Sequence, residues 1–507
     1  MQSVFFTFRL VLAGVCLSQL SHAVALDANQ LSQWIPNYQT QNTFDLANKS
    51  IDFIASNTFN GLSNLQTLYL QNNQLTALEP SLFSSSLTKL FTLNLDSNML
   101  ASLDPSLFKS LSGLGNLWLS NNKLTNLDPS LFNSLTSLSY LRLSRNQFTS
   151  LDPSIFKPLT RLTVLYLNTN QLNTLDPSIF NTLNSLRNLN LAGNQLSSLD
   201  PAIFKSLTKL EDLFLDSNQL TTLDSSMFDS LISLTRLGLS DNQFTSFDPF
   251  LFKSLTNLEH LFLYNTRLTS LDPLLFDTLT SLKSLDLFNN KLTSLDPFTF
   301  KSLTQLENLH LSSDEMTSLD PSMFNTLTSL TLLELIFSKW NALDSSIFNS
   351  LTELKELYIH NNMLSELDSF LFKNLNKLES LYLGDNKLTA LSDPFLFSDL
   401  INLQYLYLCN NKLTLIDPAL FNSLNGLVLL DLSSNQLTSL DPYLFRNLIE
   451  LQVLYMNDNH LISIDRQIFV GLINLYEVYM GSNPISLIQP SYVLQLCSSN
   501  PQCQIFI

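Results

Sequence analysis

The chain has 507 residues, a length that suggests three domains unless the sequence repeats itself. Apolar residues make up 45% of it and charged residues only 14%, which excludes a disordered chain. The formal net charge of −17 argues against nucleic acid and anionic lipid as partners, because both are bound mainly by Lys and Arg.

The first 25 residues are typical of a secretory signal peptide. Residues 5–17 are nearly all apolar, and Ala23-Val24-Ala25 fits a small-residue cleavage site. A short N-terminal anchor helix is the alternative, although a spanning helix needs roughly 20 apolar residues. No later stretch is long and apolar enough to span a membrane. We therefore expect a secreted, extracellular protein whose mature chain has no transmembrane segment.

Residues 26–64 are expected to form an N-terminal cap that contains one degenerate repeat. They include no cysteine, so the cap is expected to be built around other residues, such as Trp34 and Tyr38. Asn48 begins an Asn-Lys-Ser sequon, which predicts N-glycosylation in a secreted protein.

Residues 65–488 contain eighteen copies of one pattern, almost all 24 residues apart. Leu114-x-x-Leu117-x-Leu119-x-x-Asn122-x-Leu124 is one copy. Its alternating leucines predict a strand with one buried face. A single turn of this length cannot bury its own leucines, so stacked turns must share one core. The asparagine is expected where the chain leaves the strand, bonded to backbone groups of its own and the neighbouring turn.

This pattern resembles the 24-residue extracellular type of the leucine-rich-repeat family. The resemblance implies a β-rich repeat solenoid of α/β type. Such a fold is a curved horseshoe with a parallel sheet on the concave face and loops or short 3₁₀ turns on the convex one. The resemblance also implies that the protein binds another macromolecule rather than catalysing a reaction.

Two further columns recur in most copies. A phenylalanine, as in Phe132, is expected to form a spine of the core on the convex side. An Asp-Pro pair, as in Asp128-Pro129, is expected to cap a short helical turn. A calcium-binding ladder is the alternative for the carboxylates, but each repeat offers only one, and calcium takes six to eight oxygens.

The solvent-facing residue between the second and third leucine is often aromatic, and exposed aromatic residues are favoured contact residues. Aromatic and other residues alternate strictly in the first half of the array. The alternative is that the rings merely cover the sheet. The candidate contact residues at this position are Trp118, Tyr166, Phe214, Phe262, Tyr358, Tyr382, Tyr407, Tyr455 and Tyr479.

The repeat around residues 332–340 is unusual, because apolar side chains replace polar ones at positions expected to face solvent. A contact site is predicted there. Inward rotation of Ile336 and Phe337 in a decayed repeat is the alternative. The candidates are Leu332, Ile336 and Phe337, with Tyr264, Phe262 and Phe288 two or three strands away.

No catalytic, cofactor or metal site is expected. His260, His310 and His360 fall on strands two repeats apart, a gap of roughly 10 Å, whereas zinc ligands must reach one ion at about 2 Å. Residues 489–507 are expected to form a short C-terminal cap in which Cys497 and Cys503 pair. Cys409 is then left as a free thiol.

The leading hypothesis is therefore a secreted protein that binds an extracellular protein or glycan through its concave face, in adhesion, receptor–ligand or immune-type recognition. The alternative is a structural matrix component or the scaffold subunit of a secreted complex. Neither hypothesis identifies the partner or an oligomeric state.

Overall fold

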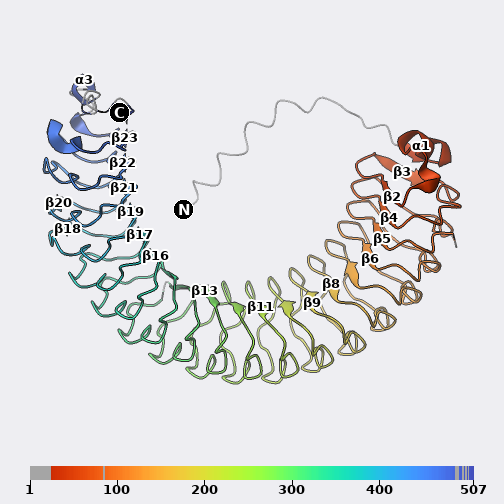
Figure 1. Ribbon diagram of the computed structural model, residues 1–507. Coiled ribbons are helices and arrows are strands. Elements are labelled where there is room, and N and C mark those ends of the chain that lie inside the picture. Colours follow the sequence, from red (N-terminus) through yellow and green to blue (C-terminus); the bar gives the residue numbers. More distant parts are fainter. Residues whose placement is uncertain are drawn as a thin grey trace. The chain divides into compact units, whose positions relative to one another are not determined.

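A computed structural model describes residues 24–83, 86–313, 315–485, 490–493, 496, 500 and 502–507 (Figure 1). The chain divides into two compact units, residues 1–162 and 163–507, which are described separately. No helix in the described part of the chain is long and apolar enough to cross a membrane.

The first unit begins with a cap and continues as stacked turns. Its helices are α1 (Ala28–Trp34) and the 3₁₀ helix η1 (Tyr38–Thr40). Its strands are β1 (Val24–Leu26), β2 (Thr43–Asp45), β3 (Ile51–Ile54), β4 (Thr67–Tyr69), β5 (Thr92–Asn94), β6 (Asn116–Trp118) and β7 (Tyr140–Arg142). Strands β2, β4, β5, β6 and β7 form a parallel sheet in chain order, and β1 pairs with β3.

The second unit, described by itself, is built of the same kind of turns and has a longer parallel sheet, whose strands line the inner side of that unit's curve in Figure 1. The sheet contains β8 (Val164–Tyr166), β9 (Asn188–Asn190), β10 (Asp212–Phe214), β11 (Arg236–Gly238), β12 (His260–Phe262), β13 (Ser284–Asn290), β14 (Asn308–Ser313), β15 (Leu332–Leu335), β16 (Glu356–Tyr358), β17 (Ser380–Tyr382), β19 (Tyr405–Tyr407), β21 (Leu429–Asp431), β22 (Val453–Tyr455), β23 (Glu477–Tyr479) and β24 (Gln504–Phe506). The two-residue strands β18 (Ala390–Leu391) and β20 (Leu415–Ile416) pair separately on the turn side. The remaining helices are η2 (Arg466–Phe469) and α3 (Pro490–Val493).

The parallel-sheet solenoid that the family resemblance implied is confirmed. The strand register places each middle leucine beside the next, as with Leu93 and Leu117. Leu117 is fully buried, whereas Trp118 beside it is only partly buried. Most strands end after three residues, because a residue in the left-handed region soon follows them. Asn121, with a φ of 54°, is one example, and most equivalents are small or polar residues that tolerate this conformation.

The asparagine column forms the predicted ladder. The Asn122 amide nitrogen donates to the carbonyl oxygens of Leu119 (3.2 Å) and, in the preceding repeat, Leu95 (3.0 Å). The Leu100 N–H donates back to the Asn122 Oδ1 atom (3.0 Å). Each asparagine therefore satisfies buried backbone groups of two consecutive repeats. At one position of this column, threonine replaces the asparagine. The hydroxyl of this residue, Thr266, donates a hydrogen bond to Asn290 Oδ1 (2.8 Å).

The phenylalanine and aspartate columns also lie as expected on the turn side. Phe228, Phe252 and Phe276 are fully buried, and their rings stack at centroid distances of 6.3 and 6.5 Å. The Ser130 N–H donates to Asp128 Oδ1 (2.8 Å), and so does the Ser130 hydroxyl (2.6 Å). These hydrogen bonds hold the pKa of the exposed Asp128 below its usual value. The carboxylate thus acts as the expected cap, but the segment that it caps is a hydrogen-bonded turn and not a helix.

Both ends of the array are closed by non-repeat segments. In α1, Asp27 accepts the Gln30 N–H (2.8 Å) as an N-cap, and Leu31 is buried. The Tyr38 ring packs edge-on against buried Phe44, so the N-terminal cap is built without cysteines. At the other end, β24 adds a final strand beside β23.

The expected signal peptide falls mostly outside the described residues. Val24 and Ala25, however, form the first two residues of β1, which pairs with β3. Cleavage after Ala25 would therefore leave only Leu26 of this strand.

Candidate functional site

The solvent-facing side of each sheet carries the candidate contact residues between the buried leucines. Trp118 lies on β6 of the first unit, and the other aromatic candidates lie in the second unit. The aromatic residues predicted at the position between the second and third leucine are all partly buried and thus partly accessible. Strand geometry therefore places them where a partner can reach them.

In the first unit, Trp118 belongs to an aromatic–cation cluster. The Arg142 guanidinium carbon lies 5.2 Å from the Trp118 ring centroid and 5.1 Å from that of Tyr140. An Arg142 Nη2 hydrogen bond to the Tyr140 hydroxyl oxygen (2.8 Å) fixes this arrangement. The protein here places its own cation against an aromatic ring of the neighbouring strand.

On β8 to β12 of the second unit, the rings stand two strands apart. Phe214 and Phe262 are separated by Gly238, whose hydrogen faces the side chain of Asp216. A Cβ at position 238 would lie 2.1 Å from an Asp216 oxygen, so a larger residue here would require the Asp216 side chain to move. Burial raises the pKa of Asp216 to about 6, although Ser240 donates a backbone hydrogen bond to it.

A second aromatic group gathers around β13 to β16. The Phe337 ring meets those of Phe288 and His360 edge-on, each at 6.1 Å between centroids. Phe337 has a φ of 49°, in the left-handed region that is unfavourable for a bulky side chain. Beside this group, a hydrogen bond between His310 and Glu334 raises the pKa of His310.

The contact site predicted at residues 332–340 requires a correction. Ile336 is only 4% exposed, so it lies in the core rather than on a surface that a partner can touch. Trp340 is fully buried too, in the place that leucine occupies in other repeats. Leu332 and Phe337 remain partly accessible. The inward rotation of Ile336 that the sequence left open is the arrangement found, whereas Phe337 stays at the surface.

The strongest aromatic arrangement lies at the end of the second unit. The Tyr358 and Tyr382 rings stack at 4.2 Å between centroids, and Tyr382 and Tyr407 stack at 4.5 Å. Tyr455 and Tyr479 form a second stack at 4.6 Å, which the Phe506 ring continues at 4.6 Å. Sequence reasoning placed the tyrosines on neighbouring strands but missed Phe506, because residues 504–506 do not follow the repeat pattern.

Acidic side chains orient the tyrosine stacks. The Tyr358 hydroxyl donates to Glu356 Oε2 (2.6 Å), and the Tyr479 hydroxyl donates to Glu477 Oε2 (3.1 Å). Burial, with neighbouring tyrosine and carboxylate groups, raises the pKa of Tyr407 to about 12. These hydroxyls are therefore neutral hydrogen-bond donors at physiological pH.

The cysteine and glycosylation predictions stay predictions. Cys497 lies outside the described residues, although Cys503 is disulfide-bonded. Cys409 is a free thiol, and burial, assisted by the Asp431 carboxylate, raises its pKa to about 12. Such a thiol is a poor nucleophile.

The predicted glycosylation site, Asn48, is exposed on a turn, where an oligosaccharide could be attached.

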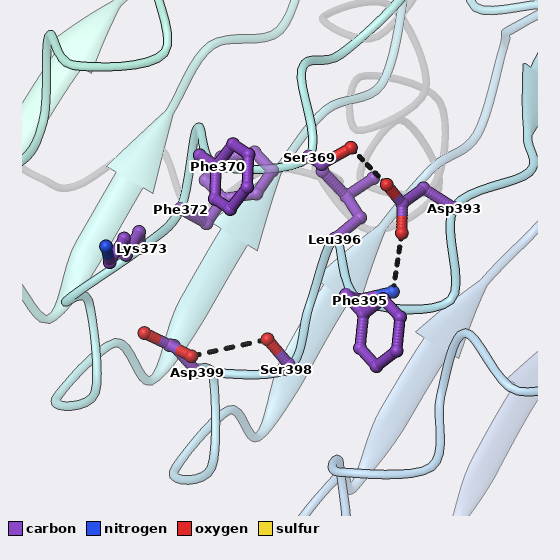
Figure 2. Close-up of a pocket in the computed structure, with 9 residues that line it drawn as sticks. All are labelled: Ser369, Phe370, Phe372, Lys373, Asp393, Phe395, Leu396, Ser398 and Asp399. Atoms are coloured by element: carbon purple, nitrogen blue, oxygen red, sulfur yellow. Dashed lines mark hydrogen bonds between the residues drawn. The ribbon is translucent and has the colours of Figure 1, made fainter.

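A surface that sequence reasoning missed lies on the turn side of the second unit. Phe370 and Phe395 are 64% and 70% exposed and, with Lys373, line a pocket of about 280 Å³. Figure 2 shows the hydrogen bond from Ser369 to Asp393 that joins the two turns. The signal was present in the sequence, because phenylalanine here replaces the serine that usually ends the Asp-Pro-Ser turn. Phe250 and Phe298 occupy the same position.

The three histidines considered for metal binding lie on separate strands: His260 on β12, His310 on β14 and His360 just after β16. In the described residues, no group of three or more His, Cys, Asp or Glu side chains could hold a metal ion.

The comparisons with known proteins identify the repeat. The family pattern described as Leucine rich repeat matches residues 42–100, 88–148, 136–196, 185–244, 232–292, 280–339, 392–437 and 425–485. A related pattern, Leucine Rich repeats (2 copies), matches residues 352–396. No curated protein sequence matches this chain significantly.

Solved structures share the fold at low sequence identity. A leucine-rich-repeat protein of Leptospira interrogans is 24% identical, with a TM-score of 0.61, covering 96% of this chain and 100% of that one. A chain of the Drosophila Toll–Spatzle complex is 23% identical, with a TM-score of 0.67, covering 87% of this chain and 58% of that one. The functional domain of InlJ from Listeria monocytogenes is 26% identical, with a TM-score of 0.50 and 69% of each chain covered. With the family pattern repeated along most of its length, the chain belongs to the leucine-rich-repeat family.

Proposed function

We propose that this leucine-rich-repeat protein is secreted and binds a protein or glycan partner through the solvent-facing side of its sheet. The role would be adhesion, receptor–ligand or immune-type recognition. The observation that carries the proposal is the pair of tyrosine stacks on β16 to β24, because accessible, orderly aromatic rings provide large contact area at low entropic cost. Toll, which shares the fold, is solved in complex with Spatzle.

The negative charge of the chain supports the proposal that its partner is not a nucleic acid. The net charge of −17 and the carboxylates beside the tyrosines would repel phosphate groups. The apolar N-terminal segment supports export of the chain.

A second candidate function, the scaffold subunit of a secreted complex, is favoured by the exposed phenylalanines on the turn side. Phe298, Phe370 and Phe395 are each more than 60% exposed, as expected of a surface that is covered in a permanent assembly.

One experiment separates the two functions. The full chain is expressed in a secreting cell, recovered from the medium, and used to capture proteins and glycans from extracellular fluid. One variant replaces Tyr358, Tyr382 and Tyr407 with alanine, and its counterpart replaces Phe298, Phe370 and Phe395 with serine.

Loss of capture in the tyrosine variant alone supports recognition through the sheet, and loss in the phenylalanine variant alone supports the scaffold. Circular dichroism must show that both variants fold. Failure of the chain to reach the medium would contradict secretion.

A further inference from the structure

The column of stacked tyrosines is interrupted at one strand. On β21, the residue at the tyrosine position is Asp431, which the sheet register places beside Tyr407 on β19 and Tyr455 on β22. Each of these tyrosines is the last ring of its stack. Asp431 therefore lies, in the sheet register, between the ends of two aromatic stacks.

The space between the two rings suits a cation. Two strand intervals separate Tyr407 from Tyr455, a distance of about 9–10 Å. A positive group midway between them would lie about 5 Å from each ring centroid, within the roughly 6 Å over which a cation–π interaction acts. The Asp431 carboxylate would meet the same group from the sheet side.

The Asp431 carboxylate is held by uncharged hydrogen-bond donors, one of which is the Cys409 thiol of the preceding repeat. The Asp431 Oδ1 atom accepts the Ser433 N–H (2.9 Å) and the Ser433 hydroxyl (2.6 Å). In the described part of the chain, no lysine or arginine forms an ion pair with Asp431. The carboxylate thus has no cation of its own.

On the surrounding strand segments, the side chains that are charged at neutral pH are all acidic. The strand segments with the turns that follow them contain Glu356, Asp385, Asp431, Asp458 and Glu477, and neither lysine nor arginine. These segments are residues 356–361, 380–385, 405–410, 429–434, 453–458 and 477–482. This face complements a positively charged partner.

The first unit provides an internal comparison. There the protein supplies the cation itself, because Arg142 lies against the Trp118 ring of the preceding strand at the same position of the repeat. At Asp431 the sign is reversed, and a carboxylate occupies that position between two tyrosines.

We infer that the slot between Tyr407 and Tyr455 binds an arginine side chain of a basic segment of the protein partner. The inference rests on the proposed function and specifies its partner chemistry. Arginine fits better than lysine, since its planar guanidinium can stack between rings while it donates two hydrogen bonds to one carboxylate.

The test uses a fluorescein-labelled nona-arginine peptide and the full chain at about 0.15 M salt, where long-range attraction is screened. Asp431→Asn should weaken binding about tenfold, because the charge pair is lost and the stacking geometry remains. Asp458→Asn is the matched control. It removes the same charge one strand away at a left-handed position that asparagine tolerates, and it should change affinity less than about twofold.

A second pair of variants tests the aromatic walls. Tyr455→Phe keeps the ring and should bind the peptide normally, whereas Tyr455→Ala should weaken binding about tenfold. Equal losses for Asp431→Asn and Asp458→Asn, or binding that is insensitive to Tyr455→Ala, would overturn the slot and leave only a general acidic surface.

Capture of the natural partner distinguishes failure of this inference from failure of the proposed function. If capture depends on the tyrosines but not on Asp431, the slot is wrong and the sheet remains the binding face. If capture depends on neither, both ideas fail.

Discussion

A single asparagine, Asn122, satisfies backbone groups of two consecutive repeats, so its loss should be costly. Asn122→Ala leaves the Leu95 and Leu119 carbonyls and the Leu100 N–H without this partner in the core. We expect the free energy of unfolding to fall by about 1–3 kcal/mol. Asn133→Ala, at an exposed position, should change it by less than about 0.5 kcal/mol. Urea unfolding of the two variants checks this, and similar losses in both would contradict the ladder.

Asp216 gives the stability a defined pH dependence. Its pKa is about 6 in the folded protein and near 3.8 when exposed, so the folded state binds the proton more tightly. The charged form is therefore destabilising, and stability is lost as pH rises from about 4 to 6. Asp216→Asn keeps an acceptor for the Ser240 N–H without the charge. We expect the variant to exceed the natural chain by about 1–3 kcal/mol at pH 7 and by much less at pH 4. An equal difference at both pH values in urea unfolding would disprove this role.

At the scale of one repeat turn, two phenylalanines only two positions apart play opposite roles. Phe252 is fully buried between Phe228 and Phe276, whereas Phe250 is 56% exposed. Phe252→Ala should lower the free energy of unfolding by about 3–5 kcal/mol, because it leaves a cavity in the stacked column. Phe250→Ala should leave it within about 0.5 kcal/mol. Thermal unfolding compares the two directly, and a large loss for Phe250→Ala would show that this exposed ring supports the fold.

The sequence pattern predicted the elements that recur in every repeat, because packing against the neighbouring repeats determines their structure. The alternation of Leu117 and Leu119 placed β6 correctly, and the asparagine spacing predicted the ladder, because both depend on one periodic core. Ile336 could not be placed by pattern, since its repeat lacks the usual asparagine and polar turn. Its burial depends on how the turn carrying Phe337 rotates.

The sequence predicted which positions carry the candidate contact residues, but not how their side chains are arranged. The tyrosine column was visible in the sequence, yet ring stacking depends on side-chain rotamers that a repeat pattern does not fix. The place of Asp431 between Tyr407 and Tyr455 could have been found by writing the strand residues in register. Phe370 and Phe395 were missed because the Asp-Pro column drew attention to its capping aspartate alone.

Across the whole molecule, contacts run mainly between consecutive repeats, so damage should spread only to neighbours. Phe252→Ala removes ring contacts with the turns before and after it. We expect amide hydrogen exchange to accelerate in residues 210–281 and to stay unchanged in residues 24–162, because local opening needs only the interfaces of the altered repeat to break. Exchange measured by mass spectrometry on the natural chain, Phe252→Ala and Phe250→Ala resolves this. A uniform acceleration along the chain would mean that the array opens as one cooperative unit, in which case a partner bound at the tyrosine stacks would also protect the first unit from exchange.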